Sequence, residues 1–379
     1  MGIEYVYIFF YLIPCLFVYK GVSVKSSINI IFWNFYLLIL ILYIGARFQI
    51  GGDWVQYLYT LEVKDYSKFS ISSLHQDPLY EILVYVLYNL NLSVLSLNLI
   101  CASVFAYGLS KFALRQPSPW LVMTIASSYF IVAVGMGYTR QSFAIGISML
   151  IINALIDRKL IIAIILYIIG SFFHISIILF GIVFLAYLSK INSLLKFTFF
   201  CVTFILIFFI FSIVSYERIL NLVDFFIIEA NEMYYSGGAL IRLTINFICA
   251  ILFLVFANYF TTDLIEKRIY FFISVSVIIL FFLSFNLSVF ADRLNLYFNI
   301  LQFFVLSRLP YIFKKFINIY LIKIPVTVFY LLLLIFWLHL SPYQSSWKPY
   351  QSYLFPHEDR FDCNKAFMKG TIVSDIVCE

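Results

Sequence analysis

Patterns that bind metals or nucleotides are missing from this sequence. It has only six Cys and four His. It contains neither a CxxC pair nor a His/Cys cluster, so a zinc site is not expected. A DxD-like carboxylate pair and a Walker loop are also missing, which argues against nucleotide-dependent chemistry. No basic, aromatic-rich patch of the kind that binds nucleic acid is present. We therefore expect no metal, no cofactor and no nucleic-acid partner.

Charged residues are also scarce. Only 12% of the 379 residues are Asp, Glu, Lys or Arg, whereas a soluble domain has about 25%. In their place, 64% of the residues are hydrophobic and the mean hydropathy is +1.00. One water-soluble core cannot hide so much apolar surface. The composition predicts an all-α integral membrane protein, with most of the 44 Phe and 29 Tyr facing lipid or packing between helices.

Apolar runs of membrane-spanning length recur along most of the chain. A span needs about 20 apolar residues, and by this measure we expect about 12 transmembrane helices. The first run lacks a preceding basic region and a following cleavage site, so we interpret it as a span and not as a signal peptide. The predicted spans are 3–19, 29–46, 93–110, 119–136, 140–156, 160–173, 175–188, 197–214, 240–260, 269–290, 294–309 and 324–341.

Basic residues predict the orientation, because cytoplasmic loops collect Lys and Arg. Lys20 and Lys25 follow the first span and place the N-terminus outside. We interpret 77–90 as a helix lying on the outer surface and 160–188 as two short spans, with one long tilted helix or a re-entrant pair as the alternatives for 160–188. With these choices, 14 of the 25 basic residues but only three of the 19 acidic residues lie inside. If 77–90 crossed the membrane, or if 160–188 formed a single tilted helix, the predicted orientation of every later span would be reversed.

Three non-membrane pieces are then expected outside the cell. They are the loop 47–92, the loop 215–239 and the tail 342–379. We accordingly divide the chain into a polytopic transmembrane domain, 1–341, and an extracytoplasmic tail, 342–379.

The tail contains two cysteines, Cys363 and Cys378. Outside the cell they would meet an oxidising compartment, which favours a disulfide between them. The alternative is a pair of free thiols.

Polar residues stand at the ends of several predicted spans, where ionisable groups are functional candidates. The predicted topology brings Asp53, Arg140, His174, Arg242 and Arg293 to the extracytoplasmic face. Of these, Asp53, Arg140, His174 and Arg293 are the catalytic candidates. Six side chains are candidates for binding substrate: Arg47, Tyr57, Tyr138, Gln141, Arg242 and Asp292.

Several of these residues have simpler interpretations. Arg47 can extend to lipid head groups. Asp292 can pair with Arg293 or cap a helix. His174 can be a packing histidine.

The chemistry of this set suits a lipid pyrophosphate. Arginine is permanently charged and binds phosphate through two parallel hydrogen bonds. Arg140 and Arg293 would therefore bind and stabilise a pyrophosphate leaving group. Asp53 and His174 are groups able to accept a proton from a sugar hydroxyl, and the sequence does not distinguish between them as the base.

Four motifs carry a resemblance to a known family. They read RFQIGGDWVQY, DPLYEILVYVL, MGYTRQSFAIGIS and SFFHISIIL, and they resemble the EpsG-like branch of Wzy-type polysaccharide polymerases over about residues 40–190. By this resemblance, the family's functional motif residues correspond to Asp53 in the GGD motif, to Arg140-Gln141 and to His174. Arg293 is not part of these motifs and is a candidate only because of its position at the end of a predicted span. Many polymerases have a large central periplasmic loop that this chain lacks.

The resemblance implies a metal-independent glycosyltransferase of GT-C-like polymerase and ligase architecture in the bacterial inner membrane. Such an enzyme joins oligosaccharide repeat units carried on undecaprenyl pyrophosphate, at the outer face. Membrane lipid, a chain-length regulator and a flippase are the further partners implied.

Three rival functions remain open. An O-antigen ligase would share the fold and the arginines. A transporter of polysaccharide or lipid-linked sugar would show inverted repeats and charges near the midplane, and neither is apparent. A membrane acyltransferase would use a cytoplasmic or buried histidine, whereas His174 is expected outside.

Overall fold

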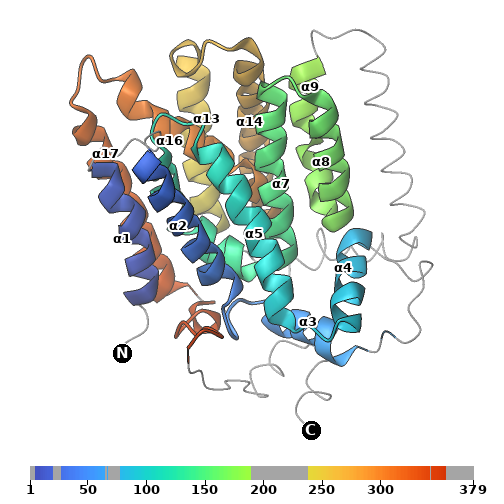
Figure 1. The fold of residues 1–379 in the computed structure, drawn as a ribbon. Helices are drawn as coiled ribbons and strands as arrows, with labels where there is room; N and C mark the ends of the chain where they lie inside the picture. Colours follow the sequence, from blue (N-terminus) through green and yellow to red (C-terminus); the bar gives the residue numbers. More distant parts are fainter. Residues whose placement is uncertain are drawn as a thin grey trace.

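The computed structural model describes residues 5–19, 27–64, 66, 77–188, 238–341 and 343–355, and these are almost entirely helical. Within these ranges the extended pairing is one isolated bridge between Arg47 and Ser352. The helices run between the two ends of a bundle (Figure 1), as the all-α prediction requires. The α-helices are α1 (Tyr5–Tyr19), α2 (Ser27–Gly45), α3 (Trp54–Leu58), α4 (Pro78–Asn89), α5 (Val94–Ala113), α6 (Pro119–Ala126), α7 (Thr139–Ile156), α8 (Leu160–Phe173), α9 (Ile182–Leu188), α13 (Ala239–Phe260), α14 (Leu264–Leu283), α15 (Ser288–Phe298), α16 (Ile300–Ile312) and α17 (Ile319–Leu340).

Four of the described helices are long and apolar enough to cross a membrane: α5, α7, α13 and α17. Further apolar helices, including α1, α8 and α16, are shorter. The chain therefore has the helices of a membrane protein, but the expected number of about twelve spans is not confirmed.

Two predicted spans are interrupted in the structure. Residues 119–136 form α6, a turn and then the π-helical segment η3 (Phe130–Gly135). The predicted span 294–309 begins inside α15 and continues into α16, with Asn299 between the two helices. The interruptions fall at Ser127-Ser128-Tyr129 and at Asn299, but the runs around them are apolar enough that average hydropathy did not reveal the breaks.

Helix α4 corrects the expectation of a helix lying on the surface. It stands upright below α8 (Figure 1) and packs against it, with the rings of Tyr80 and Phe173 5.8 Å apart. Its 12 residues extend over about 18 Å, which is less than the roughly 30 Å of a hydrocarbon core. Helix α4 is thus neither a span nor a surface helix.

The segment 160–188 forms two legs that meet at His174. Helix α8 ends there, the backbone of His174 is extended, and the 3₁₀ segment η4 (Ile175–Gly181) leads into α9. The Tyr167 hydroxyl of the first leg donates to the Ile178 carbonyl of the second at 2.8 Å. The prediction of two segments, in preference to one long helix, is confirmed.

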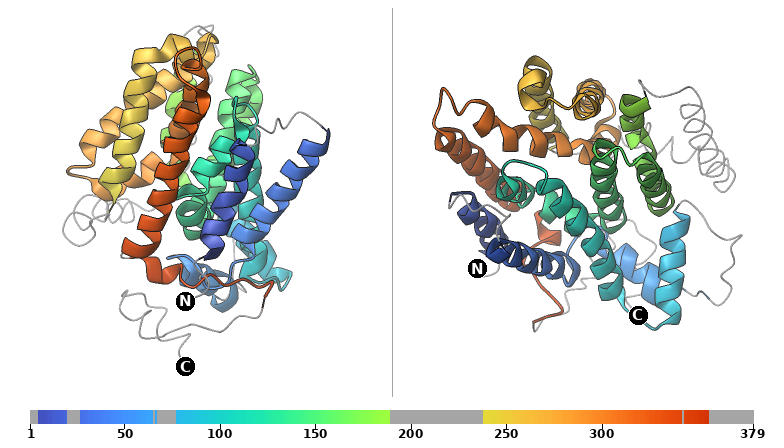
Figure 2. Two further views of the ribbon diagram at one scale, coloured as in Figure 1. Left: turned by 90° about the vertical axis from the view of Figure 1, so that its left-hand side faces the viewer. Right: turned by 45° about the horizontal axis from the view of Figure 1, so that its top comes forward.

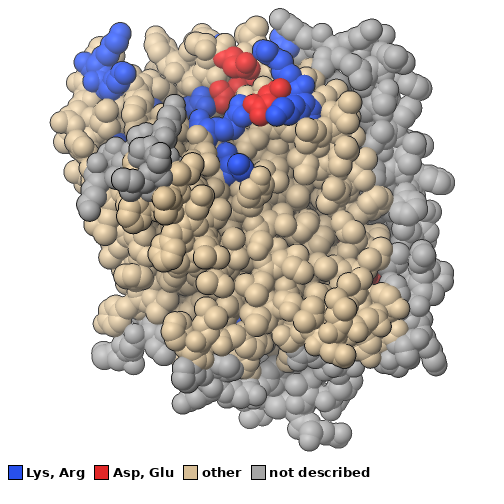
Figure 3. Space-filling model, viewed as in Figure 1, with Lys and Arg blue, Asp and Glu red and all other residues tan. Residues whose placement is uncertain are grey.

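Among the described residues, the loops predicted to be cytoplasmic gather at one end of the bundle. Asp263 begins α14 as its N-cap and accepts from the backbone of Ile265 and Glu266. On the face drawn in Figure 3, charged side chains concentrate near this end, and most of the surface below is uncharged. Three ion pairs connect these loops: Arg115–Asp157 at 2.6 Å, Arg158–Asp263 at 3.6 Å and Arg308–Glu266 at 2.8 Å.

Helices α5 and α7 approach each other closely at two glycines (Figure 2 shows the bundle from two further sides). A Cβ added to Gly146 would lie 2.6 Å from the Val104 carbonyl oxygen, and Gly108 faces Gly146 across the same contact. This contact sets the position of α7, whose first turn carries Arg140.

Residues 343–355, after α17, pack onto the opposite end of the bundle. The Trp347 indole donates to the Val132 carbonyl at 2.9 Å, and the Tyr353 backbone N–H donates to Ala46 at 2.8 Å. This part of the predicted tail therefore packs against the helical body, and the division of the chain at 341 stays a prediction.

Some predictions concern residues outside the described ranges. These are the span 197–214, nearly all of the loop 215–239, and the two cysteines Cys363 and Cys378. The expected disulfide stays a prediction.

Candidate active site

The predicted site residues come together at the bundle end opposite the ion-paired loops. They come from the segment after α2, the first turn of α7, the end of α8, the start of α13, and α15. Chain segments more than 200 residues apart therefore contribute to one region. The convergence predicted from topology is present in the structure.

Asp77 connects two of the predicted residues, Arg140 and His174. Its Oδ2 lies 3.1 Å from Arg140 Nη1 and 3.4 Å from His174 Nδ1. The Asp77 side chain is nearly inaccessible, at 4%, whereas Arg140 keeps 27% and His174 22% of their side-chain surface. The buried carboxylate thus holds a cation and an imidazole that both remain reachable.

Asp77 is the site residue that the sequence interpretation missed. It precedes Pro78 at the start of α4 but does not cap that helix with its side chain. Instead its Oδ1 accepts from the backbone N–H of Ile175 at 3.0 Å and so fixes the turn after His174. The DPLYE motif contains Asp77, so a signal was present in the sequence, but Asp77 was not among the predicted site residues.

Burial alone raises the pKa of the Asp77 carboxyl. His174, Arg140 and the Ile175 N–H outweigh burial, and the net shift of the pKa is downward. Asp77 therefore stays ionised, which it must be to accept hydrogen bonds from both neighbours.

Two tyrosines complete the surroundings of Arg140. Its guanidinium lies over the Tyr80 ring, 5.2 Å from the centroid, and Tyr57 is close enough to interact electrostatically with it. Tyr57 is buried beside Arg140, and its role in binding substrate stays a prediction.

Arg293 is connected to the start of α7 through Gln141, the residue that follows Arg140. The Gln141 side chain donates to the Arg293 carbonyl at 2.9 Å, which ties α15 to α7. The Arg293 guanidinium stacks on Tyr138, 4.1 Å from the ring centroid. Asp53 is close enough for its charge to act on both Arg293 and Tyr138. Asp53 therefore belongs with Arg293, whereas His174 belongs with Arg140.

Asp292 forms a bidentate ion pair with Arg242. The two contacts are 2.8 Å from Nε to Oδ1 and 2.6 Å from Nη2 to Oδ2. The hydrogen-bonded partner of Asp292 is thus Arg242, while its charge also acts on Arg293, and its role in binding substrate stays a prediction. The guanidinium of Arg242 also lies 5.0 Å from the Tyr129 ring centroid. Arg242 is thus held rigidly between α13 and α15.

Arg47 is an interior residue, with 1% of its surface exposed. Its guanidinium donates to the carbonyls of Ile44 and Ile50 and to the side chains of Asn98 and Thr139. These donors join the end of α2 to α5 and α7. Neither the predicted substrate contact nor the alternative of reaching head groups fits this position, so Arg47 is structural.

An apolar cavity adjoins Arg242. It measures about 310 Å³ and lies between α6, η3, α13, α16 and α17. Tyr129, Arg242 and Ser341 contribute polar groups, while Ile245, Leu333 and Phe336 are among its apolar walls. The cavity therefore combines one cationic group with a lipid-like lining.

Among the described residues, no three His, Cys, Asp or Glu side chains are grouped closely enough to hold a metal ion. The expectation of a metal-independent reaction stays a prediction.

Comparison with known protein families identifies the family of this chain. The model of the EpsG family matches residues 30–352, which is most of the chain. This chain belongs to the EpsG family. The match to the EpsG family includes every residue of the site and continues into the tail as far as the segment that packs on Ala46. No curated protein and no solved structure matches the chain.

Proposed function

We propose that this EpsG-family protein is a polysaccharide polymerase. It transfers a growing glycan from undecaprenyl pyrophosphate to the next lipid-linked repeat unit, at the extracytoplasmic face of the bacterial inner membrane. The observation that carries the proposal is the contact of Arg140 with the Asp77–His174 pair at one bundle end, where Gln141 also ties Arg293 on α15 to the start of α7. Family membership supports the polymerase class.

Arg140 and Arg293 bind the pyrophosphate in this proposal. Both guanidiniums are partly exposed and lie against tyrosine rings, which limits their rotation. Negative charge grows on the pyrophosphate as its bond to the anomeric carbon breaks, and preorganised cations stabilise that charge. Asp53 stays close to Arg293 and orients it.

His174 is the proposed base, because Asp77 orients it. An imidazole that donates from Nδ1 to a carboxylate presents its Nε2 as a proton acceptor. The acceptor hydroxyl oxygen forms a bond to the anomeric carbon, the bond to pyrophosphate breaks, and His174 takes the hydroxyl proton. The pyrophosphate carrier leaves as an anion next to the arginines.

The apolar cavity beside Arg242 is suited to part of the polyprenyl chain of the carrier. Most of its lining comes from α13, α16 and α17, with the rest from the segment of α6 and η3, so the lipid would enter from the side of α13 and α17. A tail held there would bring its pyrophosphate to the arginine-rich end. A chain-length regulator and a flippase are the expected protein partners.

The test is the polysaccharide profile of a deletion strain complemented with single variants. Arg140→Ala, Arg293→Ala and His174→Ala should each abolish long polymer and leave single capped units. Loss of one charge-stabilising donor costs about 10²–10³ in rate, and loss of a base about 10²–10⁴. Arg140→Lys should restore little, because a point charge does not replace the two-pronged guanidinium.

The matched control is Arg115→Ala, which removes an arginine from an ion pair at the opposite end of the bundle. It should leave chain length unchanged at equal protein level. Wild-type chain lengths in Arg140→Ala and Arg293→Ala would overturn the pyrophosphate assignment. A deletion strain without capped units would favour a ligase, and one that retains lipid-linked units inside the cell would favour a transporter.

A further inference from the structure

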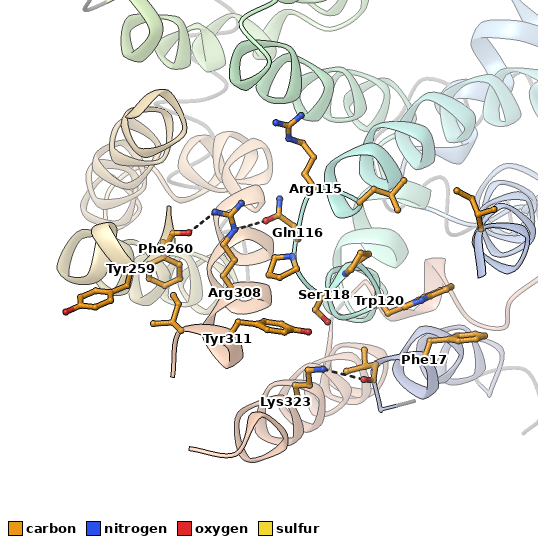
Figure 4. Close-up of a pocket in the computed structure, with 16 residues that line it drawn as sticks. Phe17, Arg115, Gln116, Ser118, Trp120, Tyr259, Phe260, Arg308, Tyr311 and Lys323 are labelled. Carbon is orange, nitrogen blue, oxygen red and sulfur yellow. Dashed lines mark hydrogen bonds between the residues drawn. The ribbon is translucent and has the colours of Figure 1, made fainter. Parts of the chain in front are cut away.

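A second, larger cavity lies at the bundle end opposite the candidate active site. It measures about 850 Å³, within the range of about 300–1,000 Å³ that is usual for small-molecule sites. It is enclosed by the end of α1, the start of α2, the α5–α6 connection, the ends of α13 and α16, and the start of α17. Figure 4 shows its polar and aromatic side chains around a common space. Nothing in the proposed polymerase reaction uses this cavity.

Two of its three cations are neutralised by neighbours. Arg308 makes two contacts to Glu266, at 2.8 and 3.0 Å, and also donates to Gln116. Arg115 pairs with Asp157 at 2.6 Å. These two arginines therefore bring little uncompensated positive charge.

Lys323 is different. Only 6% of it is exposed, and its Nζ has a single hydrogen-bond contact, 3.5 Å from the Val18 carbonyl oxygen. Among the described residues, no carboxylate lies within 4.0 Å of it. Its other neighbours are the rings of Tyr311 and Tyr320, 5.6 and 5.8 Å from the ammonium. A buried ammonium is costly without an anion, so the cavity is suited to one.

The rest of the lining is apolar and aromatic. Phe17 and Trp120 stack with centroids 4.4 Å apart. Ile30 and Tyr259 line the cavity while 44% and 73% of their surfaces are exposed, so the cavity reaches the outer surface of the bundle. Aromatic side chains of this kind are enriched where a membrane protein meets lipid head groups. The occupant must therefore be anionic at one end and apolar at the other.

We propose that this cavity binds the head group and upper acyl chain of an anionic phospholipid, with its phosphate on Lys323. Basic pockets between transmembrane helices are suited to such head groups. The bound lipid connects α1 and α17 at the end of the bundle where our topology places the cytoplasm. This inference is independent of the polymerase proposal.

Native mass spectrometry of the purified, delipidated full-length protein tests the proposal. The protein is titrated with phosphatidylglycerol, with phosphatidylcholine and with inorganic phosphate. Phosphatidylcholine has the same phosphate but also a choline cation, which repels Lys323 and leaves its head group without net charge. Phosphatidylglycerol should therefore bind at least roughly tenfold more tightly than phosphatidylcholine, a difference the size of one charge-assisted contact. Equal binding of the two lipids by the wild-type protein would overturn the proposal, and so would displacement of bound phosphatidylglycerol by inorganic phosphate at equal concentration.

Variants assign the binding to Lys323. Lys323→Met should weaken phosphatidylglycerol binding roughly tenfold, whereas Lys323→Arg should retain it. The matched control is Lys315→Met, which removes the same charge from an exposed position outside the lining and should change nothing. Unchanged binding by Lys323→Met, or an equal loss in Lys315→Met, would overturn the assignment. If Lys323→Met does not fold, the comparison of the two lipids on the wild-type protein still decides.

Discussion

Asp77 illustrates how a single residue gains its role from distant partners. An aspartate before proline at a helix start ordinarily caps its own helix. Here the carboxylate turns away and contacts Arg140, His174 and the backbone of Ile175, about 60 to 100 positions along the chain. We therefore consider Asp77 a positioning residue that acts through His174.

Asp77→Asn tests this role. The amide oxygen can still accept from Ile175, so the fold should persist, but the charge that holds His174 and Arg140 is lost. We expect kcat to fall about 10²-fold or more while the KM for the acceptor unit changes little. The measurement is in-vitro polymerisation of purified lipid-linked units, with the melting curve as a check on folding. Asp157→Asn, which breaks an ion pair at the far end, should behave like wild type. A rise in KM without a change in kcat would contradict the positioning role.

At the scale of helices, the contact between α5 and α7 determines where the first turn of α7 lies. Gly146→Ala places a Cβ 2.6 Å from a backbone oxygen of α5. Because both atoms are fixed to helix backbones, the clash can be relieved only by moving the helices apart. Overpacking of this kind costs about 1–3 kcal/mol. We expect a lower melting temperature in detergent and a loss of activity, because Arg140 moves with α7.

Gly52→Ala is the control for this prediction, because a Cβ at Gly52 would meet no atom within 4 Å. Its melting temperature should equal that of the wild type. An unchanged melting temperature for Gly146→Ala would show that the two helices separate at little cost.

At the scale of the whole molecule, the separation of the two ends predicts the orientation in the membrane. The cavity with Lys323 and the ion-paired loops lie at one end, and the candidate active site lies at the other. Topology reporters fused after Lys25, Lys196 and Lys315 should report cytoplasm. Reporters fused after Lys64, Glu232 and Ser352 should report the outside. A cytoplasmic signal after Glu232 would reverse the orientation of the C-terminal half.

Composition and charge pattern alone determined the class of this protein. A chain with so few charges can bury its apolar surface only in lipid, and helices satisfy their own backbone hydrogen bonds there. The asymmetric placement of Lys and Arg was sufficient to sort the loops into two groups, and the structure keeps each group together at one end. The motifs around Asp53, Arg140 and His174 were likewise sufficient to indicate the family.

Only the tertiary structure decided what each polar residue does. Arg47 and Arg140 look equivalent in sequence, but packing buries the first among neutral oxygens and leaves the second partly exposed beside Asp77. The pairing of Asp292 with Arg242, the breaks within two predicted spans and the return of residues 343–355 to the bundle were not predictable either. Each depends on contacts between segments far apart in the chain, which local hydropathy and charge do not encode.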